Sequence, residues 1–311
     1  MNYTNIGPLD RNRIAEALRP FGDVKTDEPM SAHTSFRTGG PARIFIRPNS
    51  ADELTRILKY LASEAVTPLI IGNGTNVIFA DEGFGGIVIC IGAGLNAIER
   101  NAETLTAGAG ALLSEAAAAA AQAGLSGFEA LSGIPGTVGG AVYMNAGAYE
   151  HEIQDIVTAV TACSPESGEL LTYGQADLAF AYRGSVFQRN GGVVTSVTFG
   201  LTSRPEAEIR ADMRDYARRR RDKQPIEMPS AGSFFKRPAG AYAGALIEQA
   251  GLKGRSVGGA RVSEKHAGFI VNTGGAATAD ILRLMKLVQD TVFGQTGIML
   301  EPEPRIIGAD G

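Results

Sequence analysis

Two glycine-rich segments carry the clearest chemical signal in this sequence. Gly72-Asn73-Gly74-Thr75-Asn76 follows a short apolar run, and its small residues leave successive backbone N–H groups open to an anionic ligand. No Gly-Lys-Ser/Thr follows, so this is not an ATP-hydrolysing P-loop. The segment Gly133–Tyr149 is longer and consists mostly of small or conformationally special residues. Such a length of bare backbone predicts a surface for a flat, extended cofactor, whereas Gly72–Asn76 alone is equally compatible with a simple turn.

A third glycine pattern imitates a dinucleotide fingerprint. The segment Gly92–Ala97 follows the apolar run Ile87–Ile91 and matches the pattern GxGxxA. That fingerprint needs a helix immediately afterwards, because the pyrophosphate binds at the helix N-terminus. Asn96–Asn101 allows barely one turn before the next strand pattern. We therefore expect a turn here and no Rossmann site.

Composition restricts the class of protein. Forty of the 311 residues are glycine, about twice the usual share of ~7%, yet without a triplet period, so the chain is not collagen-like. Hydrophobic residues make up 44% and charged residues 20%, which indicates a folded protein. The net charge of −4 argues against a nucleic-acid partner. The basic run Arg218–Arg221 ends a predicted helix and is compatible with a solvated face or with an anion site.

Cysteine and histidine usage points to a reducing compartment and to no metal. Cys90 and Cys163 lie in β-like apolar runs, which predicts buried thiols. Two Cys and three His offer no metal-ligand spacing. The N-terminus lacks the apolar core of a signal peptide, and no stretch approaches the length of a membrane span. We expect a cytoplasmic protein.

The elements that must position the glycine-rich segments fall into three regions. The first has a helix over 8–20 and a β-α-β unit, in which Ser50 caps a helix with apolar positions at Leu54, Ile57, Leu58 and Leu61. In the second, short strands alternate with turns around an alanine-rich helix at Ala116–Ala121. The third is mainly helical. The strands expected are 42–47, 68–71, 86–91, 104–107, 156–163, 169–172, 193–199, 268–271 and 298–307; the later helices are 206–221, 243–250 and 278–293.

A series of motifs, in order along nearly the whole chain, resembles one family. The glycine-rich segments are similar to the FAD-binding segments of UDP-N-acetylenolpyruvoylglucosamine reductases, which make UDP-N-acetylmuramic acid for bacterial peptidoglycan. Further motifs agree and point to the shorter, second type of this family. They are His33–Gly40, Tyr182–Phe187, Ala231–Lys236, Val262–Ala267 and Leu300–Gly308.

The resemblance implies a fold and a domain plan. The fold is α+β, with a vanillyl-alcohol-oxidase-like FAD-binding region of two α+β subdomains and a separate α+β substrate-binding domain. The first subdomain would be residues 1–71 with the C-terminal strand 299–311. The second would be residues 72–204. The substrate-binding domain would be residues 205–298.

The resemblance also implies a reaction. NADPH reduces a non-covalent FAD, and flavin N5 then delivers a hydride to the terminal carbon of the enolpyruvyl group. Arg183 and Glu303 would stabilise the resulting enolate, and Ser233 would supply the proton. A guanidinium suits the first role because it does not deprotonate. Glu303 would need a pKa raised by burial in order to donate a hydrogen bond.

The remaining site residues are implied by the same matching. Tyr182, Lys236, Arg237 and Gln249 would contact the UDP-sugar, with Lys236 offering a point charge to the diphosphate. The cofactor-binding residues would be Arg37, Gly72, Asn73, Gly74, Thr75, Asn76, Gly133, Pro135, Gly136, Thr137, Gly139, Gly140, Asn145, Ala146 and Gly147. No metal, nucleic acid or membrane partner is implied, and a monomer is expected.

Two departures from the family pattern and one histidine stand out. Arg237 occupies a position that is commonly Asn, and it adds charge. Pro304 replaces a common Val and removes one backbone N–H directly after Glu303, which puts strand pairing there in doubt. His266 reads as a packed loop residue rather than as an acid–base group.

Two other functions compete with this one. An FAD oxidase of the same fold would act on an alcohol and oxygen, often with flavin attached to a histidine. None of His33, His151 and His266 lies in the glycine-rich segments, which disfavours that reading. A non-catalytic nucleotide-sugar binding protein is the third candidate. It would not need the trio Arg183, Ser233 and Glu303.

Overall fold

The computed structural model describes residues 3–309, which divide into two compact units. Within the described residues, unit 1 is formed by 3–26, 44–73 and 86–218. Unit 2 is formed by 27–43, 74–85 and 219–309. Both units mix helices and strands, so the α+β class is confirmed. The three-domain plan cuts the chain at other points and stays a prediction.

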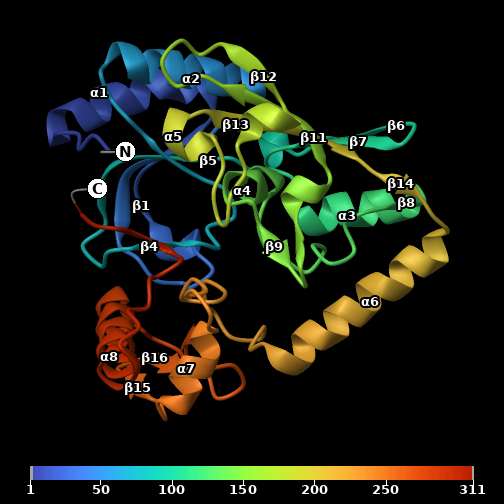
Figure 1. Cartoon of the computed structure of the whole chain (residues 1–311). Helices are drawn as coiled ribbons and strands as arrows, with labels where there is room; N and C mark the ends of the chain where they lie inside the picture. Colours follow the sequence, from blue (N-terminus) through green and yellow to red (C-terminus); the bar gives the residue numbers. More distant parts are fainter. Residues whose placement is uncertain (1–2, 310–311) are drawn as a thin grey trace. The chain divides into compact units, whose positions relative to one another are not determined.

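Unit 1 contains most of the helices. Helix α2 (Ala51–Ser63) begins as predicted, because the Ser50 hydroxyl accepts a hydrogen bond from the Glu53 N–H at 3.1 Å. Its four predicted apolar positions are all buried. Arg13 of α1 (Pro8–Leu18) hydrogen-bonds Glu64 at the end of α2, so the two helices lie side by side (Figure 1). The others are α3 (Leu113–Gln122), α4 (Val138–Tyr143), α5 (Phe187–Asn190) and α6 (Glu206–Lys223), which runs past the end of unit 1.

A five-stranded antiparallel sheet forms the centre of unit 1. Its order is β12 (Leu170–Gly174), β11 (Val157–Cys163), β13 (Val193–Gly200), β7 (Thr104–Gly108) and β6 (Ile98–Asn101). Strand β6 has no strand signal in the sequence, because it holds a single apolar residue. Pairing with β7 across the turn at Ala102 stabilises it instead. Phe128 and Phe199 meet edge to face at 4.7 Å in the core.

A second sheet has the order β1 (Asp23–Pro29), β2 (Pro41–Arg47), β5 (Phe84–Cys90) and β3 (Leu69–Ile71). The predicted β-α-β unit runs through β2, α2 and β3, and β5 lies between its two strands, parallel to β3. After β5 the chain makes only a 3-10 turn, η3 (Ala93–Leu95), before β6. The expectation of a turn in place of a Rossmann site is therefore confirmed. Gly94 is glycine because a β-carbon there would lie 2.3 Å from the Pro48 carbonyl oxygen.

Unit 2 has a small core of its own. A three-stranded antiparallel sheet, β15 (Ser256–Val257), β16 (Ala260–Val262) and β17 (Ile270–Asn272), packs with α7 (Ala243–Gln249) and α8 (Thr278–Thr296) (Figure 1). Strand β4 (Val77–Phe79) pairs in parallel with β18 (Arg305–Ile307). The prediction of a continuous strand over 298–307 is therefore wrong, because only its end, Arg305–Ile307, forms a named strand. Pro302 and Pro304 lack the N–H that an uninterrupted ladder requires.

Short elements complete the chain. Two-stranded ladders join β8 (Leu125–Ser126) to β14 (Thr202–Ser203) and β9 (Gly147–Ala148) to β10 (His151–Glu152). The other 3-10 turns are η1 (Arg19–Phe21), η2 (Met30–Ala32), η4 (Ile153–Asp155) and η5 (Gln175–Leu178). Over residues 3–309, no helix combines the length and the apolar character that crossing a membrane requires.

Candidate functional site

The two glycine-rich segments meet in unit 1. The Asn73 side-chain amide donates a hydrogen bond to the Pro135 carbonyl oxygen at 2.7 Å. A β-carbon on Gly72 would lie 2.2 Å from the Thr137 hydroxyl, so only glycine allows this approach. Residues 62 positions apart in the sequence are therefore in direct contact. Both segments were predicted from their composition, but their contact with each other is visible only in the structure.

Both segments present unused backbone donors. Among residues 3–309, the N–H groups of Asn73, Gly74 and Thr75 have no hydrogen-bond partner, and neither do those of Gly136 and Thr137. Successive open N–H groups in turn conformations form a nest for phosphate or other acceptor oxygens. Small side chains leave the donors accessible. Asn73, Gly136 and Thr137, all in unit 1, offer donors of the kind that bind the diphosphate of a dinucleotide cofactor such as FAD, and Gly74 and Thr75 offer the same kind of donor within unit 2.

A short helix inside the second segment was missed. Helix α4 begins at Thr137, whose hydroxyl accepts a hydrogen bond from the Gly140 N–H at 3.3 Å. Its glycines disfavour a helix, but burial of Val138, Ala141 and Val142 compensates. Gly139 donates its N–H to the Ala109 carbonyl oxygen, and a β-carbon there would lie 2.9 Å from the Ala109 β-carbon. Gly139 thus has a packing role, and its predicted role toward FAD stays a prediction.

The end of the segment is held by a buried amide. Asn145 is fully buried with a φ of 41°, and its side-chain nitrogen donates to Glu152 Oε2 at 2.9 Å and to the Ala181 carbonyl oxygen at 3.1 Å. Its side-chain oxygen accepts the Gln154 N–H. The side chain of Asn145, predicted to bind cofactor, is therefore committed to the protein itself. Ala146 and Gly147 lead into β9, with Gly147 close against the His151 carbonyl oxygen.

Arg183 lies at the tip of a tight turn in unit 1. Ala181 and Gly184 exchange two backbone hydrogen bonds of 3.0 Å, so Tyr182 and Arg183 form the loop. Arg183 has a φ of 56°, which is unusual for a residue with a β-carbon. Its guanidinium lies 5.0 Å from the centre of the half-exposed Tyr182 ring. The turn presents both predicted site residues together.

The motif His33–Gly40 packs against Gly74 within unit 2. A β-carbon on Gly74 would lie 1.9 Å from the His33 carbonyl oxygen, and the Ser35 N–H donates to the Gly74 carbonyl oxygen. Arg37 is exposed at the end of the same motif, with a φ of 58°. His33 itself is bonded to Glu28 at 2.8 Å. The motif therefore shapes the first glycine-rich segment.

Ser233 and Glu303 are brought together by backbone pairing in unit 2. The Glu303 N–H donates to the Phe234 carbonyl oxygen, and the Lys236 N–H donates to the Glu301 carbonyl oxygen, both at 2.9 Å. Phe234 is fully buried, and its backbone N–H donates to the Gly268 carbonyl oxygen. Ser233 is exposed one residue before this anchor. Two predicted catalytic residues, 70 positions apart in the sequence, thus lie next to each other where residues 234–236 pair with residues 301–303.

Pro304 fits this arrangement without loss of pairing. Residues 301–303 pair with 234–236, and from Arg305 onward β18 pairs with β4. Pro304 is buried between the two ladders, where the chain changes partner. Asn76 contacts the residues on both sides of Pro304. Its side-chain amide donates to the Glu303 carbonyl oxygen, and its backbone carbonyl oxygen accepts the Arg305 N–H. The doubt raised by the missing N–H is resolved.

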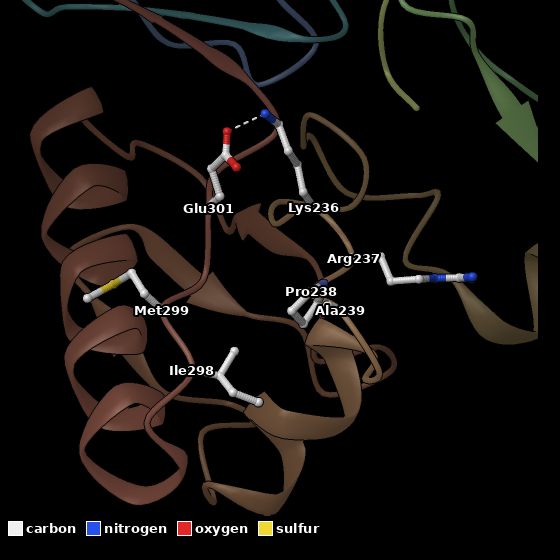
Figure 2. Close-up of a pocket in the computed structure, with 7 residues that line it drawn as sticks. All are labelled: Lys236, Arg237, Pro238, Ala239, Ile298, Met299 and Glu301. Atoms are coloured by element: carbon white, nitrogen blue, oxygen red, sulfur yellow. Dashed lines mark hydrogen bonds and ion pairs between the residues drawn. The ribbon is translucent and has the colours of Figure 1, made fainter. Parts of the chain in front are cut away.

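A pocket of about 420 Å³ opens beside the paired residues Lys236 and Glu301. Figure 2 shows the Lys236 and Glu301 side chains directed toward each other as an ion pair, and the Arg237 side chain directed away from them. Arg237 lies over the Tyr242 ring at 4.5 Å. The predicted contact Gln249 is exposed at the end of α7 and is not part of the lining. The seven lining residues are Lys236, Arg237, Pro238, Ala239, Ile298, Met299 and Glu301.

One histidine, two cysteines and one arginine noted in the sequence are packed or ion-paired within the protein. His266 accepts the Gly268 N–H on Nδ1 and packs against the Phe269 ring, and burial lowers its pKa, so it is a packed loop residue as expected. Cys90 and Cys163 are buried free thiols whose pKa values are raised by desolvation, which confirms the expectation. In the basic run, Arg218 pairs with Asp215, and the function of the run stays open.

Comparison with known proteins agrees with this geometry. The model of an FAD binding domain matches residues 42–174, and the model described as UDP-N-acetylenolpyruvoylglucosamine reductase, C-terminal domain, matches residues 224–307. The reductase of Agathobacter rectalis is 48% identical over 307 residues, covering 95% of this chain and 97% of the relative. That of Clostridioides difficile is 46% identical over 288 residues, covering 93% and 94%.

A solved structure extends the match to three dimensions. The crystal structure of UDP-N-acetylenolpyruvylglucosamine reductase from Thermus caldophilus is 37% identical, with a TM-score of 0.80 over 92% of this chain and 99% of that one. The match to an FAD binding domain agrees with the open donors of the glycine-rich segments. The chain therefore belongs to the UDP-N-acetylenolpyruvoylglucosamine reductase family and is an FAD-dependent oxidoreductase.

Proposed function

We propose that this protein reduces UDP-N-acetylenolpyruvoylglucosamine to UDP-N-acetylmuramate with NADPH, a step of peptidoglycan biosynthesis, as a monomer in the cytoplasm. When bound, FAD would supply hydride transfer, from NADPH and then from flavin N5 to the terminal enolpyruvyl carbon. The open N–H groups of residues 73, 136 and 137, all in unit 1, would hold its polar atoms. Everything else in the reaction falls to side chains of this chain.

The charge that develops next to the new C–H bond needs a stabilising group. Arg183 would provide it, because a guanidinium is a planar cation that can bond a carboxylate, and two backbone bonds close the turn that carries it. Glu303 would act with it as a protonated carboxyl that donates a hydrogen bond to the enolate. Ser233 would then give its hydroxyl proton to the basic carbon. The serine is exposed, as a proton donor to substrate must be.

Lys236 and Arg237 would bind the diphosphate of the substrate, with Tyr182 and Gln249 as further contacts. The Lys236 ammonium is paired with Glu301, so it would exchange a carboxylate for a phosphate oxygen on binding. Arg237, whose side chain lies over the Tyr242 ring, would add positive charge near the same group. The observation that carries the whole proposal is the backbone pairing that places Ser233 next to the anchored Glu303.

The test separates the two half-reactions in a Ser233→Ala variant. NADPH should reduce the bound flavin at the rate of the unchanged protein, because the hydroxyl has no part in that step. Reoxidation of the reduced flavin by UDP-N-acetylenolpyruvoylglucosamine, followed anaerobically by flavin absorbance, should slow by about 10²-fold or more. The control is Ser256→Ala, an exposed serine of β15 in the same unit. Equal losses in both half-reactions, or no loss in the second, would contradict the proposed role.

A further inference from the structure

The strained turn that carries Arg183 is connected to the rest of unit 1 by hydrogen bonds from three side chains, of which only Asn145 has a predicted role. A left-handed φ at a residue with a β-carbon is unfavourable and persists only where neighbouring groups impose it. Two backbone bonds close the turn, but they do not fix its direction. The side chains of Gln188, Asn145 and Ser185 supply the remaining ties.

Gln188 makes the most direct of these ties. It lies in α5, five residues after Arg183, and its side-chain nitrogen donates to the Arg183 carbonyl oxygen at 3.0 Å. The same nitrogen donates to the Tyr143 carbonyl oxygen at 3.2 Å, next to the Met144 sulfur. A primary amide has two N–H donors, so these two carbonyl oxygens account for both. One side chain therefore joins the Arg183 turn to the last residue of α4.

The hydrogen bonds of Ser185 and Asn145 also connect the turn to the end of the glycine-rich segment. Ser185 is buried, and its hydroxyl donates to the Tyr143 carbonyl oxygen at 3.0 Å. Asn145 donates to the Ala181 carbonyl oxygen at the opposite side of the turn. All three ties connect the turn to residues 143–145, within the glycine-rich segment assigned to FAD. One partly buried polar network therefore connects Arg183 to that segment.

We propose that Gln188 is a positioning residue for Arg183. By holding the Arg183 carbonyl, it sets the direction in which the guanidinium leaves the turn, relative to the segment that holds FAD. This inference rests on the proposed function, in which Arg183 stabilises the enolate. Because Ser185 and Asn145 still hold residues 143–145, loss of the Gln188 donors should leave binding of FAD and its reduction by NADPH intact. It slows only the step that uses the guanidinium.

The test uses two variants of Gln188. Gln188→Glu keeps the shape but places a carboxylate against two carbonyl oxygens, and Gln188→Met fills the space without any donor. In both we expect reoxidation of the reduced flavin by UDP-N-acetylenolpyruvoylglucosamine to slow by roughly 10²-fold, as for a catalytic group displaced by about 1 Å. FAD content and the rate of reduction by NADPH should match the unchanged protein. The control is Arg189→Ala, which removes the exposed neighbouring side chain of the same helix.

A double-mutant cycle separates positioning from a general structural effect. If Gln188 acts through Arg183, then Gln188→Met should cause little further slowing in an Arg183→Ala background. Additive losses, equal losses in both half-reactions, or an unchanged rate in the single variants would overturn the inference. The wild-type protein and Arg183→Ala report on the proposed function separately. If the wild-type flavin is not reoxidised by the substrate, the function and this inference both fall; if those two proteins behave as proposed and the Gln188 variants do not, only the inference falls.

Discussion

Gly74 and Gly294 show how differently two glycines of one chain are constrained. At Gly74, φ is 62° and a β-carbon would lie 1.9 Å from a backbone oxygen of His33, which cannot move aside like a flexible side chain. At Gly294, inside α8, a β-carbon would meet open space. The sequence marks both positions only as glycine. The contact partners decide that the first is obligatory and the second is not.

Replacing Gly74 by alanine should therefore destabilise the protein and weaken FAD binding. The left-handed conformation alone costs an alanine about 1–2 kcal/mol, and relieving the clash would shift the neighbouring open N–H groups. We expect a lower thermal midpoint and a reduced ratio of flavin to protein absorbance after purification. Gly294→Ala is the matched control and should stabilise by up to about 1 kcal/mol, because alanine is the better helix former. A Gly74→Ala protein with full FAD content and an unchanged midpoint would refute this assignment.

At the scale of elements, α8 depends on a cap from a distant segment. The Asp81 carboxylate accepts the N–H groups of Thr278 at 2.7 Å and Ala279 at 2.8 Å, and the Thr278 hydroxyl donates to the Phe79 carbonyl oxygen. Asp280 accepts the Gly259 and Ala277 N–H groups, which hold its pKa below the usual range. The first turn of α8 is thus satisfied by side chains from outside as well as inside the helix. The residues between 74 and 85 thereby become part of the support of α8.

Asp81→Asn should loosen the start of α8. The amide keeps the size of the carboxylate but loses its charge and one of its two acceptor oxygens, and loss of a helix cap costs about 0.5–2 kcal/mol. Hydrogen–deuterium exchange of the peptides covering 278–284 should become faster, while exchange in α2 stays unchanged. Glu82→Gln, at the exposed neighbouring position, should have no such effect. Unchanged protection at the start of α8 in Asp81→Asn would show that the cap contributes nothing.

At the scale of the whole molecule, unit 2 is not a continuous piece of chain. Its core contains Phe36 and Ile78 together with Phe234, and Phe36 meets Phe234 edge to face at 6.2 Å. Strand β18 has β4 as its partner, and α8 has Asp81. Two early segments therefore complete a unit whose remainder lies after residue 218. Folding of unit 2 requires contacts that span more than two hundred residues.

A fragment of residues 219–311 should for this reason lack a cooperative fold. Losing the buried side chains of Phe36 and Ile78 removes roughly 1.5–3 kcal/mol each, a large part of a typical total stability of about 5–15 kcal/mol. We expect a broad thermal transition by circular dichroism and weak near-ultraviolet signals, with the full chain as reference. A sharp, reversible transition of the fragment would mean that residues 27–43 and 74–85 are dispensable for unit 2.

The sequence by itself determined the features that depend on neighbouring residues. The cap at Ser50 and the apolar spacing of α2 were both correct, because helix periodicity and capping are local. The short turn at Ala93 was correct because too few residues remain for a helix. The motif series also identified the family and its cofactor, since it spans nearly the whole chain.

Only the tertiary structure decided which distant residues meet. It turned part of a glycine-rich segment into α4, paired 234–236 with 301–303, placed Pro304 where two ladders exchange, and joined Gln188 and Asn145 to the Arg183 turn. Local sequence does not encode these contacts, because a hydrogen-bonding side chain or a glycine is compatible with many partners. Which partner it finds depends on the path of the whole chain, and on the burial that makes an unpaired polar group too costly to leave.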